Sequence, residues 1–456
     1  MKCNVSSGST FYHNKMAENT EGPAEVTGNL GKEEDAGPAG GGGAGGGGEN
    51  LKRKAEDAGV LPQEPDPTKR LRQEGGAGSQ LTPQVAQHYN RLEEKGLAHR
   101  NQSRIFHLRN FNNWIKSMLI ADTLRRLRAD SPGGRLCVLD LGVGKGGDLL
   151  KWKKGGIDHL VCADLAETSV QQCEERYRSM AGREGRGPRV FSAEFIAADC
   201  AKEDLSRRYR DPDTTFDLVS CQFVLHYSFE SHAQADRMLR NAGERLRPGG
   251  YFIGTTPDGY ELVRRLQAAE GLSFGNSIYS ITFQQKEDFP LFGCQYDFHL
   301  EGVVDCPEFL VYFPLLEKMA ERYGLRLVYR QTFAEFFQQQ VTQGEGRGLL
   351  ERMKALETYP PHEGQELASS DPEDYAHARA RLEELRSKGE GGDRGTPEHP
   401  RVGTLSLAEW EATSLYLVYC FQKVEENKDN STSNQPQPPE TSQNQSQPPE
   451  TSQTSQ

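Results

Sequence analysis

Short apolar runs alternate with longer helical patterns over residues 82–423, whereas the chain on either side is polar. Ile115, Met118 and Leu119 recur at helical spacing and predict a helix over residues 106–127. Seven later apolar runs predict strands at residues 136–141, 160–163, 191–198, 216–222, 250–254, 325–329 and 415–421. Strands that alternate with helices indicate a parallel α/β sheet with ligands at the strand carboxyl ends. The last strand comes late and is a candidate for an antiparallel orientation, which the sequence does not prove.

The polar segments divide the chain into three parts. Residues 1–81 include a run from Gly40 to Gly48 in which only Ala44 is not glycine, and residues 424–456 repeat Gln-Pro-Pro-Glu-Thr-Ser-Gln twice. Neither part can bury enough apolar surface to offset its backbone entropy, so both are predicted to be disordered. Residues 344–402 are also polar around a helical patch at residues 375–386. We interpret them as an insertion in the folded domain, because the chain becomes apolar again afterwards.

Composition excludes some classes of protein. Lys and Arg number 54 against 66 Asp and Glu, a net charge of -12. This balance argues against coating nucleic acid by bulk charge, although a local basic cleft is compatible with it. No apolar stretch has the length of a signal peptide or the ~20 residues of a membrane span, so an intracellular protein without a membrane anchor is expected. The nine cysteines form no Cys-x-x-Cys pair and no His cluster accompanies them, so no metal is expected.

Two basic clusters lie in the N-terminal part. The spacer between them contains Pro62, Pro65 and Pro67, which keep it extended. Two spaced clusters predict a bipartite nuclear import signal read by importin, and therefore a nuclear protein. The alternative is a solvated charge run in a tail. The residues of this signal are Lys52, Arg53, Lys54, Lys69, Arg70 and Arg72.

A glycine loop follows the first predicted strand. Gly142, Gly144 and Gly146 alternate with other residues, as required where a turn uses positive φ and a cofactor approaches the backbone. Asp164 closes the second strand 22 residues after Gly142, where it can accept from ribose hydroxyls. NAD and S-adenosylmethionine (SAM) fit these features equally well.

Three features favour SAM over NAD. The loop has the spacing Gly-x-Gly-x-Gly. Asp140 stands just before it, where it can balance a positively charged amino acid moiety. The segment 246–250, Leu-Arg-Pro-Gly-Gly, leads into the fifth strand, as is common in SAM-dependent methyltransferases.

Polar residues follow two further strands. Asp199 ends the third strand and can accept from an adenine amino group, and Gln222 ends the fourth. Asp199 is alternatively a helix cap. Because Asp164, Asp199 and Gln222 stand at three successive strand ends, a binding site is the better interpretation.

Five longer motifs are more specific than the glycine loop. The runs at residues 109–116 (Arg-Asn-Phe-Asn-Asn-Trp-Ile-Lys), 144–152, 222–230 (Gln-Phe-Val-Leu-His-Tyr-Ser-Phe-Glu), 307–312 and 410–416 resemble the eukaryotic nuclear mRNA cap guanine-N7 methyltransferases. The resemblance covers residues 85–423. It implies a Rossmann-like class I methyltransferase fold, a mostly parallel seven-stranded sheet with helices on both faces. Val143 departs from the family's usual Cys, and its side chain is expected to face the core.

The resemblance also implies roles for individual residues. His226, Tyr227 and Glu308 are expected to position the reactants without direct chemistry. SAM contacts are implied for Lys116, Gly142, Asp164, Asp199, Gln222 and Tyr227. Contacts to the cap guanosine and its phosphates are implied for Asn112, Asn113, Lys145, Lys151, Arg176, His226, Glu308 and Tyr416.

The residue types agree with these roles. A carboxylate such as Glu308 can accept from guanine N1–H and its exocyclic amine together, and Tyr416 or Phe223 can stack on a base. Lysines and arginine suit phosphate oxygens. Judged without the resemblance, the lysines are more often a solvated helix face, and His226 and Glu308 are equally compatible with structural roles.

The implied reaction is methyl transfer from SAM to N7 of the terminal guanosine of GpppN-capped RNA. Guanine N7 carries a free lone pair, so no general base, metal or covalent intermediate is expected. The alternatives are a methyltransferase for small molecules or protein side chains, and an inactive RNA-binding scaffold. The resemblance further implies a small RNA-binding activating subunit, with residues 375–386 as a candidate docking lobe, and assembly with the capping machinery at the transcribing polymerase.

Overall fold

The computed structural model describes Val85, Gln87, His88 and Asn90 together with residues 103–182, 190–387 and 400–424. The two predicted disordered tails (apart from Val424), the basic clusters of the import signal and Cys3 lie outside these residues. Within them, no helix is long and apolar enough to cross a membrane, and no group of three or more His, Cys, Asp or Glu residues is arranged to hold a metal ion.

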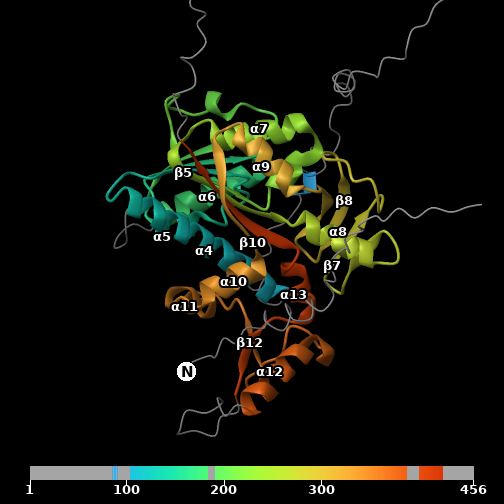
Figure 1. Cartoon of the computed structure of the whole chain (residues 1–456). Helices are drawn as coiled ribbons and strands as arrows, with labels where there is room; N and C mark the ends of the chain where they lie inside the picture. Colours follow the sequence, from blue (N-terminus) through green and yellow to red (C-terminus); the bar gives the residue numbers. More distant parts are fainter. Residues whose placement is uncertain are drawn as a thin grey trace, which may run out of the picture.

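A seven-stranded sheet with the order β10-β13-β5-β4-β1-β2-β3 forms the centre of the molecule (Figure 1). All seven predicted strands are present, with ends that shift by a few residues. Neighbouring pairs among β3, β2, β1, β4 and β5 are parallel, and β13 is antiparallel to both β5 and β10. The candidate antiparallel strand is therefore confirmed. The strands are β1 (Cys137–Leu141), β2 (His159–Asp164), β3 (Ser192–Ala197), β4 (Phe216–Gln222), β5 (Leu246–Pro257), β10 (Leu325–Thr332) and β13 (Tyr416–Lys423).

Both faces of the sheet are buried, which explains why its strands are near-continuous apolar runs. Successive residues of β1 serve opposite faces, because Val138 belongs to one core cluster and Leu139 to the other. The first core is completed by α4 (Phe106–Asp130), α5 (Leu149–Gly155), α6 (Glu167–Ala181), α8 (Gly259–Ala268), α10 (Phe333–Val341) and α13 (Leu407–Thr413). The second is completed by α7 (His232–Gly243), α9 (Phe313–Glu321) and two short 3-10 helices, η2 (Leu205–Arg207) and η3 (Leu225–Glu230). The predicted first helix and the two-faced sheet are confirmed, and Val143 is buried in the first core as expected.

The Pro-Gly-Gly segment does not precede the fifth strand but lies inside β5. Pairing between β4 and β5 shifts between Phe216 and Leu218, so the extra residues of β5 bulge out. Gly249 has φ 79° there, a conformation that glycine adopts without strain.

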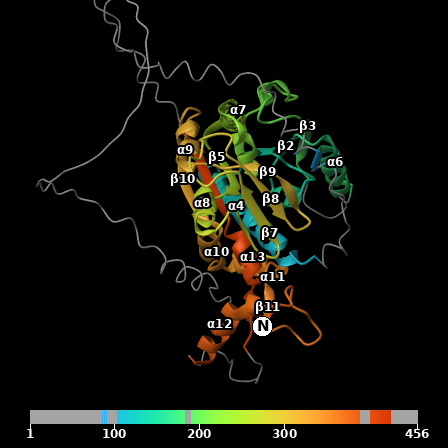
Figure 2. The same cartoon turned by 90° about the vertical axis from the view of Figure 1, so that its right-hand side faces the viewer.

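A second, antiparallel sheet follows α8 and was not predicted. It consists of β6 (Ser273–Gly275), β7 (Tyr279–Phe283), β8 (Gln295–Leu300) and β9 (Val304–Phe309), and β7, β8 and β9 lie side by side in Figure 2. Buried Tyr279 and Ile281 alternate with exposed Ser280 and Thr282, the pattern of a strand with one solvated face. Glu308 lies on β9 of this sheet, where its side chain contacts Tyr227 of η3.

Residues 344–402 hold more structure than one helical patch. They contain α11 (Gly344–Arg352), β11 (Glu357–Tyr359), η4 (Pro372–Tyr375) and α12 (Ala376–Ser387), and β12 (Val402–Thr404) pairs with β11. We call β11, η4, α12 and β12 the α12 lobe. It has a small core of its own, in which Tyr375, Leu382 and Val402 take part. Figures 1 and 2 both show the lobe extending away from the main sheet.

Candidate functional site

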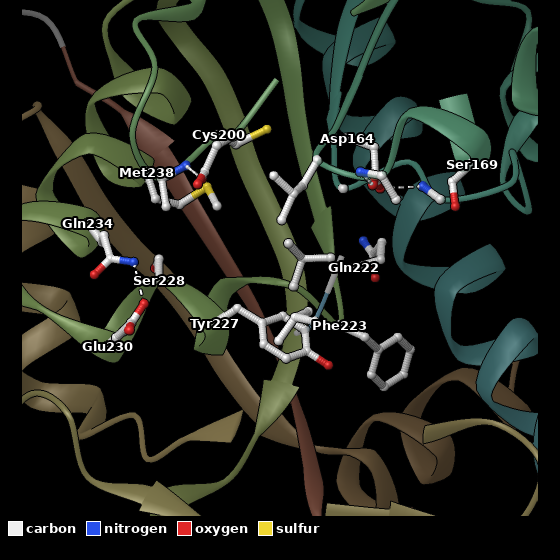
Figure 3. Close-up of a pocket in the computed structure, with 18 of the residues that line it drawn as sticks. Asp164, Ser169, Cys200, Gln222, Phe223, Tyr227, Ser228, Glu230, Gln234 and Met238 are labelled. Atoms are coloured by element: carbon white, nitrogen blue, oxygen red, sulfur yellow. Dashed lines mark hydrogen bonds between the residues drawn. The ribbon is translucent and has the colours of Figure 1, made fainter. Parts of the chain in front are cut away.

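The first cavity, of about 260 Å³, lies at the carboxyl ends of β1, β2 and β4. It is where an α/β sheet of this kind is expected to bind ligands. Asp164 and Ser169 lie on one side in Figure 3, and Glu230 and Gln234 lie on the other. Its lining includes the predicted Gly142, Asp164, Asp199, Gln222 and Tyr227. Sequence reasoning missed other lining residues, notably Ser169, Cys200, Val224, Ser228, Glu230, Gln234, Met238 and Phe309.

The glycine loop borders this cavity in the conformation that its sequence predicts. Gly142, Gly144 and Gly146 have φ of 72°, 54° and 74°. A Cβ on Gly142 would lie 2.3 Å from a methyl carbon of Val224, so any larger residue would displace the loop or the chain after β4. The loop therefore offers bare backbone to a ligand.

Asp164 is held rigidly at the end of β2. Its Oδ2 accepts from the Gly144 amide at 2.8 Å, and its Oδ1 accepts from the Ala166 amide at 2.8 Å. Burial raises the pKa of this carboxyl, and the two amides act in the opposite direction. Each carboxylate oxygen keeps a further lone pair, so the group can still accept from two vicinal hydroxyls of a ribose.

Asp199 follows β3 and serves two purposes. Its Oδ1 accepts from the Ala201 amide at 3.0 Å within a turn, and its Oδ2 lies 3.4 Å from Nζ of Lys202. It is not the helix cap considered as an alternative, because the next helix, η2, is capped by Asp204. The same side chain also lines the first cavity. Two carboxylates at strand ends, a bare glycine loop and apolar residues such as Met238 suit the ribose, amino acid and adenine parts of SAM, so the residues fit this group.

The second cavity, of about 210 Å³, lies between α4, η3, β9 and the start of β13. Its lining brings together seven of the predicted residues, which are Asn112, Asn113, Lys116, His226, Tyr227, Glu308 and Tyr416. Lys116, predicted to contact SAM, thus lies on the side of the predicted cap residues. Sequence reasoning missed Leu108 and Arg109 on α4, and also Leu300, Val303 and Val304 from the turn between β8 and β9. The alternation of apolar and polar residues along β8 and β9 was the available signal that these segments are strands, and hence that apolar residues near their turn face inward.

Glu308 is a buried residue of the second cavity's lining and is oriented by tyrosines. Tyr296, opposite Glu308 in the β8–β9 register, donates its hydroxyl to Oε2 at 2.8 Å. The hydroxyl of Tyr227 donates to Oε1 at 3.3 Å. Burial and the neighbouring carboxylate raise the pKa of Tyr296 well above its ordinary range, so this hydroxyl stays a donor. The carboxylate is therefore fixed in direction before any ligand arrives.

Three buried polar atoms of this cavity have no hydrogen-bond partner among the described residues. They are Nδ1 and Nε2 of His226 and Oδ1 of Asn112. Nε2 of His226 lies 3.3 Å from Oε1 of Glu308, but the geometry makes no hydrogen bond. Because a buried polar atom without a partner is costly, these atoms indicate that a polar ligand completes the site.

A charged network supports the wall of the second cavity. Oδ2 of Asp148 lies 2.9 Å from Nζ of Lys116, and Oδ1 lies 2.6 Å from Nζ of Lys151. Burial alone would raise the pKa of Asp148, but the two ammonium groups lower it to about 2. Lys151 also donates to Oδ1 of Asn113 at 3.3 Å. Asp148 thus holds two predicted site lysines at once, and sequence reasoning assigned it no role.

Asp140 lies beneath this network rather than on a cavity wall. It is 2% exposed and accepts from the indole of Trp152 at 3.0 Å. Burial, followed by the charge of Asp148, raises the pKa of its carboxyl to about 7. It lines neither the first nor the second cavity, so the predicted contact with an amino acid moiety has no support in the geometry.

Lys145 and Arg176 lie away from both linings. Lys145 is half-buried on the glycine loop, and Arg176 is exposed on α6. Because neither residue lines a cavity, a ligand must extend beyond the second cavity to contact them.

Phe223 and Tyr227 line both cavities, which therefore adjoin. The ring of Phe223 packs edge-on against Tyr416, with centroids 5.1 Å apart. Two ligands can thus meet across this boundary: one held by strand-end carboxylates and the glycine loop, the other by Glu308, His226 and aromatic rings.

Comparison with known proteins agrees with this geometry. The family model described as mRNA (guanine-N(7))-methyltransferase domain matches residues 72–424. The mRNA cap guanine-N(7) methyltransferase of Drosophila melanogaster is 47% identical over 78% of this chain and 81% of its own length. The enzyme of the same name from Caenorhabditis elegans is 42% identical over 75% of this chain and 86% of its own length. Among solved structures, the CcbJ methyltransferase from Streptomyces caelestis covers 69% of this chain and 90% of its own, at 16% identity and a TM-score of 0.38, too low to transfer any detail of the site. On the family match and these relatives, the chain belongs to the mRNA (guanine-N(7))-methyltransferase family.

Proposed function

We propose that this protein is a SAM-dependent mRNA cap guanine-N7 methyltransferase, which methylates N7 of the terminal guanosine of GpppN-capped RNA. The observation that carries the proposal is the contact between the two cavities at Phe223 and Tyr227. Methyl transfer requires donor and acceptor to touch, and a shared wall of two side chains provides that contact.

SAM is the methyl donor, and it supplies a methyl group already bonded to a good leaving group, a sulfonium sulfur. In this proposal the glycine loop at Gly142 binds it through the backbone, Asp164 accepts from the ribose hydroxyls, and Asp199 accepts from the adenine amine. Gln222 and Tyr227 also line the first cavity, and Tyr227 lines the second as well. Lys116 lines the second cavity rather than the first, and its proposed contact with SAM is to the end of the cofactor nearest the boundary between the two cavities.

Glu308 recognises guanine in this proposal. Its carboxylate accepts from N1–H and the exocyclic amine, two adjacent donors that adenine does not offer. His226 and Asn112 have buried polar atoms without partners, and the bound guanosine satisfies them. Tyr416 and Phe223 provide aromatic surface for the base.

The phosphates of the cap lie toward the basic residues. Lys151 donates a hydrogen bond to Asn113 beside the second cavity, and the proposal has Lys145 and Arg176 contact phosphates of an RNA that continues outward. Cations are the groups that phosphate oxygens require. The activity is thus assigned to capped RNA rather than to a free base.

The protein contributes position and electrostatics rather than a reacting group. Guanine N7 already has a lone pair, so no side chain needs to remove a proton. Alignment by the walls of two adjoining cavities can be worth ~7–11 kcal/mol. The purine becomes positively charged on methylation, and the Glu308 carboxylate binds that cation more tightly than the neutral base. Accordingly, EDTA is expected to leave the rate of the purified protein unchanged, and abolition of activity would contradict a metal-free reaction.

One assay tests the proposed function directly. Purified protein is incubated with labelled SAM and either GpppG-capped RNA, uncapped RNA of the same sequence, or free guanosine, and the methyl group is mapped on the product. Label at N7 of the capped RNA is expected. Label only on free guanosine would indicate a small-molecule methyltransferase, and SAM binding without any transfer would indicate an inactive scaffold.

The location and partners are also part of the proposal. Residues 1–81 and 424–456 are proposed as tails that flank a catalytic domain at 82–423, with nuclear import through importin directed by the two basic clusters. Work at the transcribing polymerase with the capping machinery follows from acting on nascent capped RNA. For the activating subunit, the α12 lobe is the proposed docking site. Support comes from its contact with the helix that lines the second cavity: Arg104, just before α4, lies 3.2 Å from Asp374 of η4.

A further inference from the structure

Phe223 has a backbone conformation that a bulky residue rarely adopts. Its φ is 62°, in the left-handed region, directly after the last residue of β4. Such strain persists only when the surroundings hold the residue in place, and it is concentrated at functional sites. The conformation matters here because the Phe223 ring forms part of the wall between the two cavities.

The backbone of Phe223 is held by one residue of the neighbouring strand. Its amide donates to the carbonyl oxygen of Thr255 at 3.0 Å and also to the Thr255 hydroxyl oxygen at 3.0 Å. Thr255 is opposite Gln222 in the β4–β5 register and is 0% exposed. No water reaches these bonds at such a depth, so a group that loses its bond there is not compensated by solvent.

The same hydroxyl also orients Gln222. Oγ1 of Thr255 donates to Oε1 of Gln222 at 3.2 Å, and Nε2 of Gln222 donates to the Ser220 hydroxyl at 3.2 Å. Both ends of the Gln222 amide are thereby fixed. The buried Thr255 hydroxyl therefore accepts from the amide of Phe223, which borders both cavities, and donates to Gln222, which borders the first.

We propose that Thr255 is a positioning residue for methyl transfer, which acts through Phe223 and Gln222 and touches neither ligand. Its hydroxyl fixes Phe223, at the boundary of the cavities, relative to Gln222, in the first cavity. In this way it sets the relative placement of the methyl donor and the methyl acceptor. The inference rests on the proposed function, since it takes the donor and the guanine to lie on the two sides of Phe223. A small displacement there lowers the rate strongly, because the transfer depends on alignment.

The neighbouring residue provides a matched control. Thr256 is also 0% exposed on β5, but its hydroxyl has no hydrogen-bond partner among the described residues. Thr255→Val and Thr256→Val both replace a hydroxyl by a methyl group of similar volume. The substitution is the same in both variants, so strand propensity and side-chain volume change alike. Only Thr255→Val also removes hydrogen bonds, and a difference between the variants reports on those bonds.

The experiment compares wild type, T255V, T255S and T256V by kcat, KM for GpppG-capped RNA, SAM affinity by calorimetry, and melting temperature. T255V is expected to lower kcat about tenfold or more, the consequence of losing buried hydrogen bonds, with a smaller change in either substrate's binding. T255S keeps the hydroxyl and is expected within about threefold of wild type, and T256V is expected to match wild type. T255V is expected to melt below T256V, because only T255V loses buried hydrogen bonds, so kcat is compared at a temperature at which both variants are fully folded.

Three results would overturn the proposal. T255V with wild-type kcat would show that the Thr255 hydroxyl has no part in the alignment for methyl transfer. T255S as impaired as T255V would assign the effect to the shape of the side chain, and T256V as impaired as T255V would assign it to the strand. A wild-type protein that binds SAM but does not methylate capped RNA would contradict the proposed function instead, so the two failures are distinguishable.

Discussion

The two cavities are adjacent but are built in different ways. The first is formed mainly by the ends of β1, β2 and β4 and the loops that follow them. The second joins α4, η3, β9 and β13, so that Asn112 and Tyr416 meet although 304 positions separate them. The first cavity follows from the sheet topology, whereas the second exists only when the inserted sheet and the last strand are in place.

Their polar groups differ in the same sense. In the first cavity, Asp164 already has two backbone donors. In the second, both ring nitrogens of His226 lack a partner among the described residues. A site whose buried groups are satisfied only by the correct ligand rejects ligands that lack the matching groups. Asp164 in the first cavity is thus held in place by the protein itself, whereas buried atoms of the second cavity keep hydrogen-bonding capacity for a ligand.

The largest effect is expected from Glu308 in the second cavity. Glu308→Gln keeps the shape but replaces one acceptor oxygen by a donor, so it loses an acceptor for guanine and the negative charge that binds the methylated purine. Methyl transfer to capped RNA is expected to fall about 100-fold or more, with SAM affinity within about twofold of wild type by calorimetry. Asp305→Asn on the same strand, with its side chain exposed, is the control. Equal loss of transfer and SAM binding would contradict the separation of the two cavities.

The next effect is expected in the first cavity. Asp164→Ala removes the acceptor proposed for the ribose and also the partner of the Gly144 amide. SAM affinity measured by calorimetry is expected to fall ~10–100-fold, as for hydrogen bonds to a charged group. Glu167→Gln, an exposed carboxylate nearby on α6, serves as the control. Unchanged affinity in Asp164→Ala would remove this residue from the cofactor site.

A smaller effect is expected beside the second cavity. Lys151→Gln removes one cation proposed for the cap phosphates while leaving Asp148 paired with Lys116. The KM for capped RNA is expected to rise about fivefold at low salt, with a shallower dependence on salt than in wild type. The KM for SAM should not change, and exposed Lys154→Gln on the same helix is the control. An equal response to salt in both variants would place the phosphates elsewhere.

The smallest effect concerns stability rather than activity, at Asp140 beneath the charged network of Asp148, Lys116 and Lys151. Burial and Asp148 raise the pKa of Asp140 to about 7 from 3.8, so between these pH values the folded state binds more protons than the unfolded one. The contribution of this group therefore falls as pH rises from about 4 to about 7. Asp140→Asn cannot titrate and can still accept from Trp152. Its melting temperature relative to wild type is expected to increase from pH 5 to pH 8, and a constant difference would contradict the raised pKa.

Much of the first cavity was predictable from the sequence because its parts are local. Gly142 and Asp164 stand at fixed places in a strand-turn-helix pattern, and the positive φ of the loop follows from its glycines. Asp199 is compatible in sequence with a helix cap or a site residue, and in the structure it lines the first cavity while Asp204 caps the next helix. For the second cavity only the resemblance to a family singled out Glu308 and Tyr416. Nothing in the pattern of either segment shows that the two meet.

The sequence by itself determined the seven strands, the helix before them and the glycine loop, because apolar runs, helical spacing and the freedom of glycine are properties of neighbouring residues. The tertiary structure alone decided that β9 presents Glu308 to η3, that Asp148 joins two lysines, and that Thr255 bonds both Phe223 and Gln222. Such contacts depend on how distant segments pack, and the same local pattern is compatible with many packings. The backbone strain at Phe223 is the clearest case, since no residue preference predicts it and a neighbouring strand maintains it.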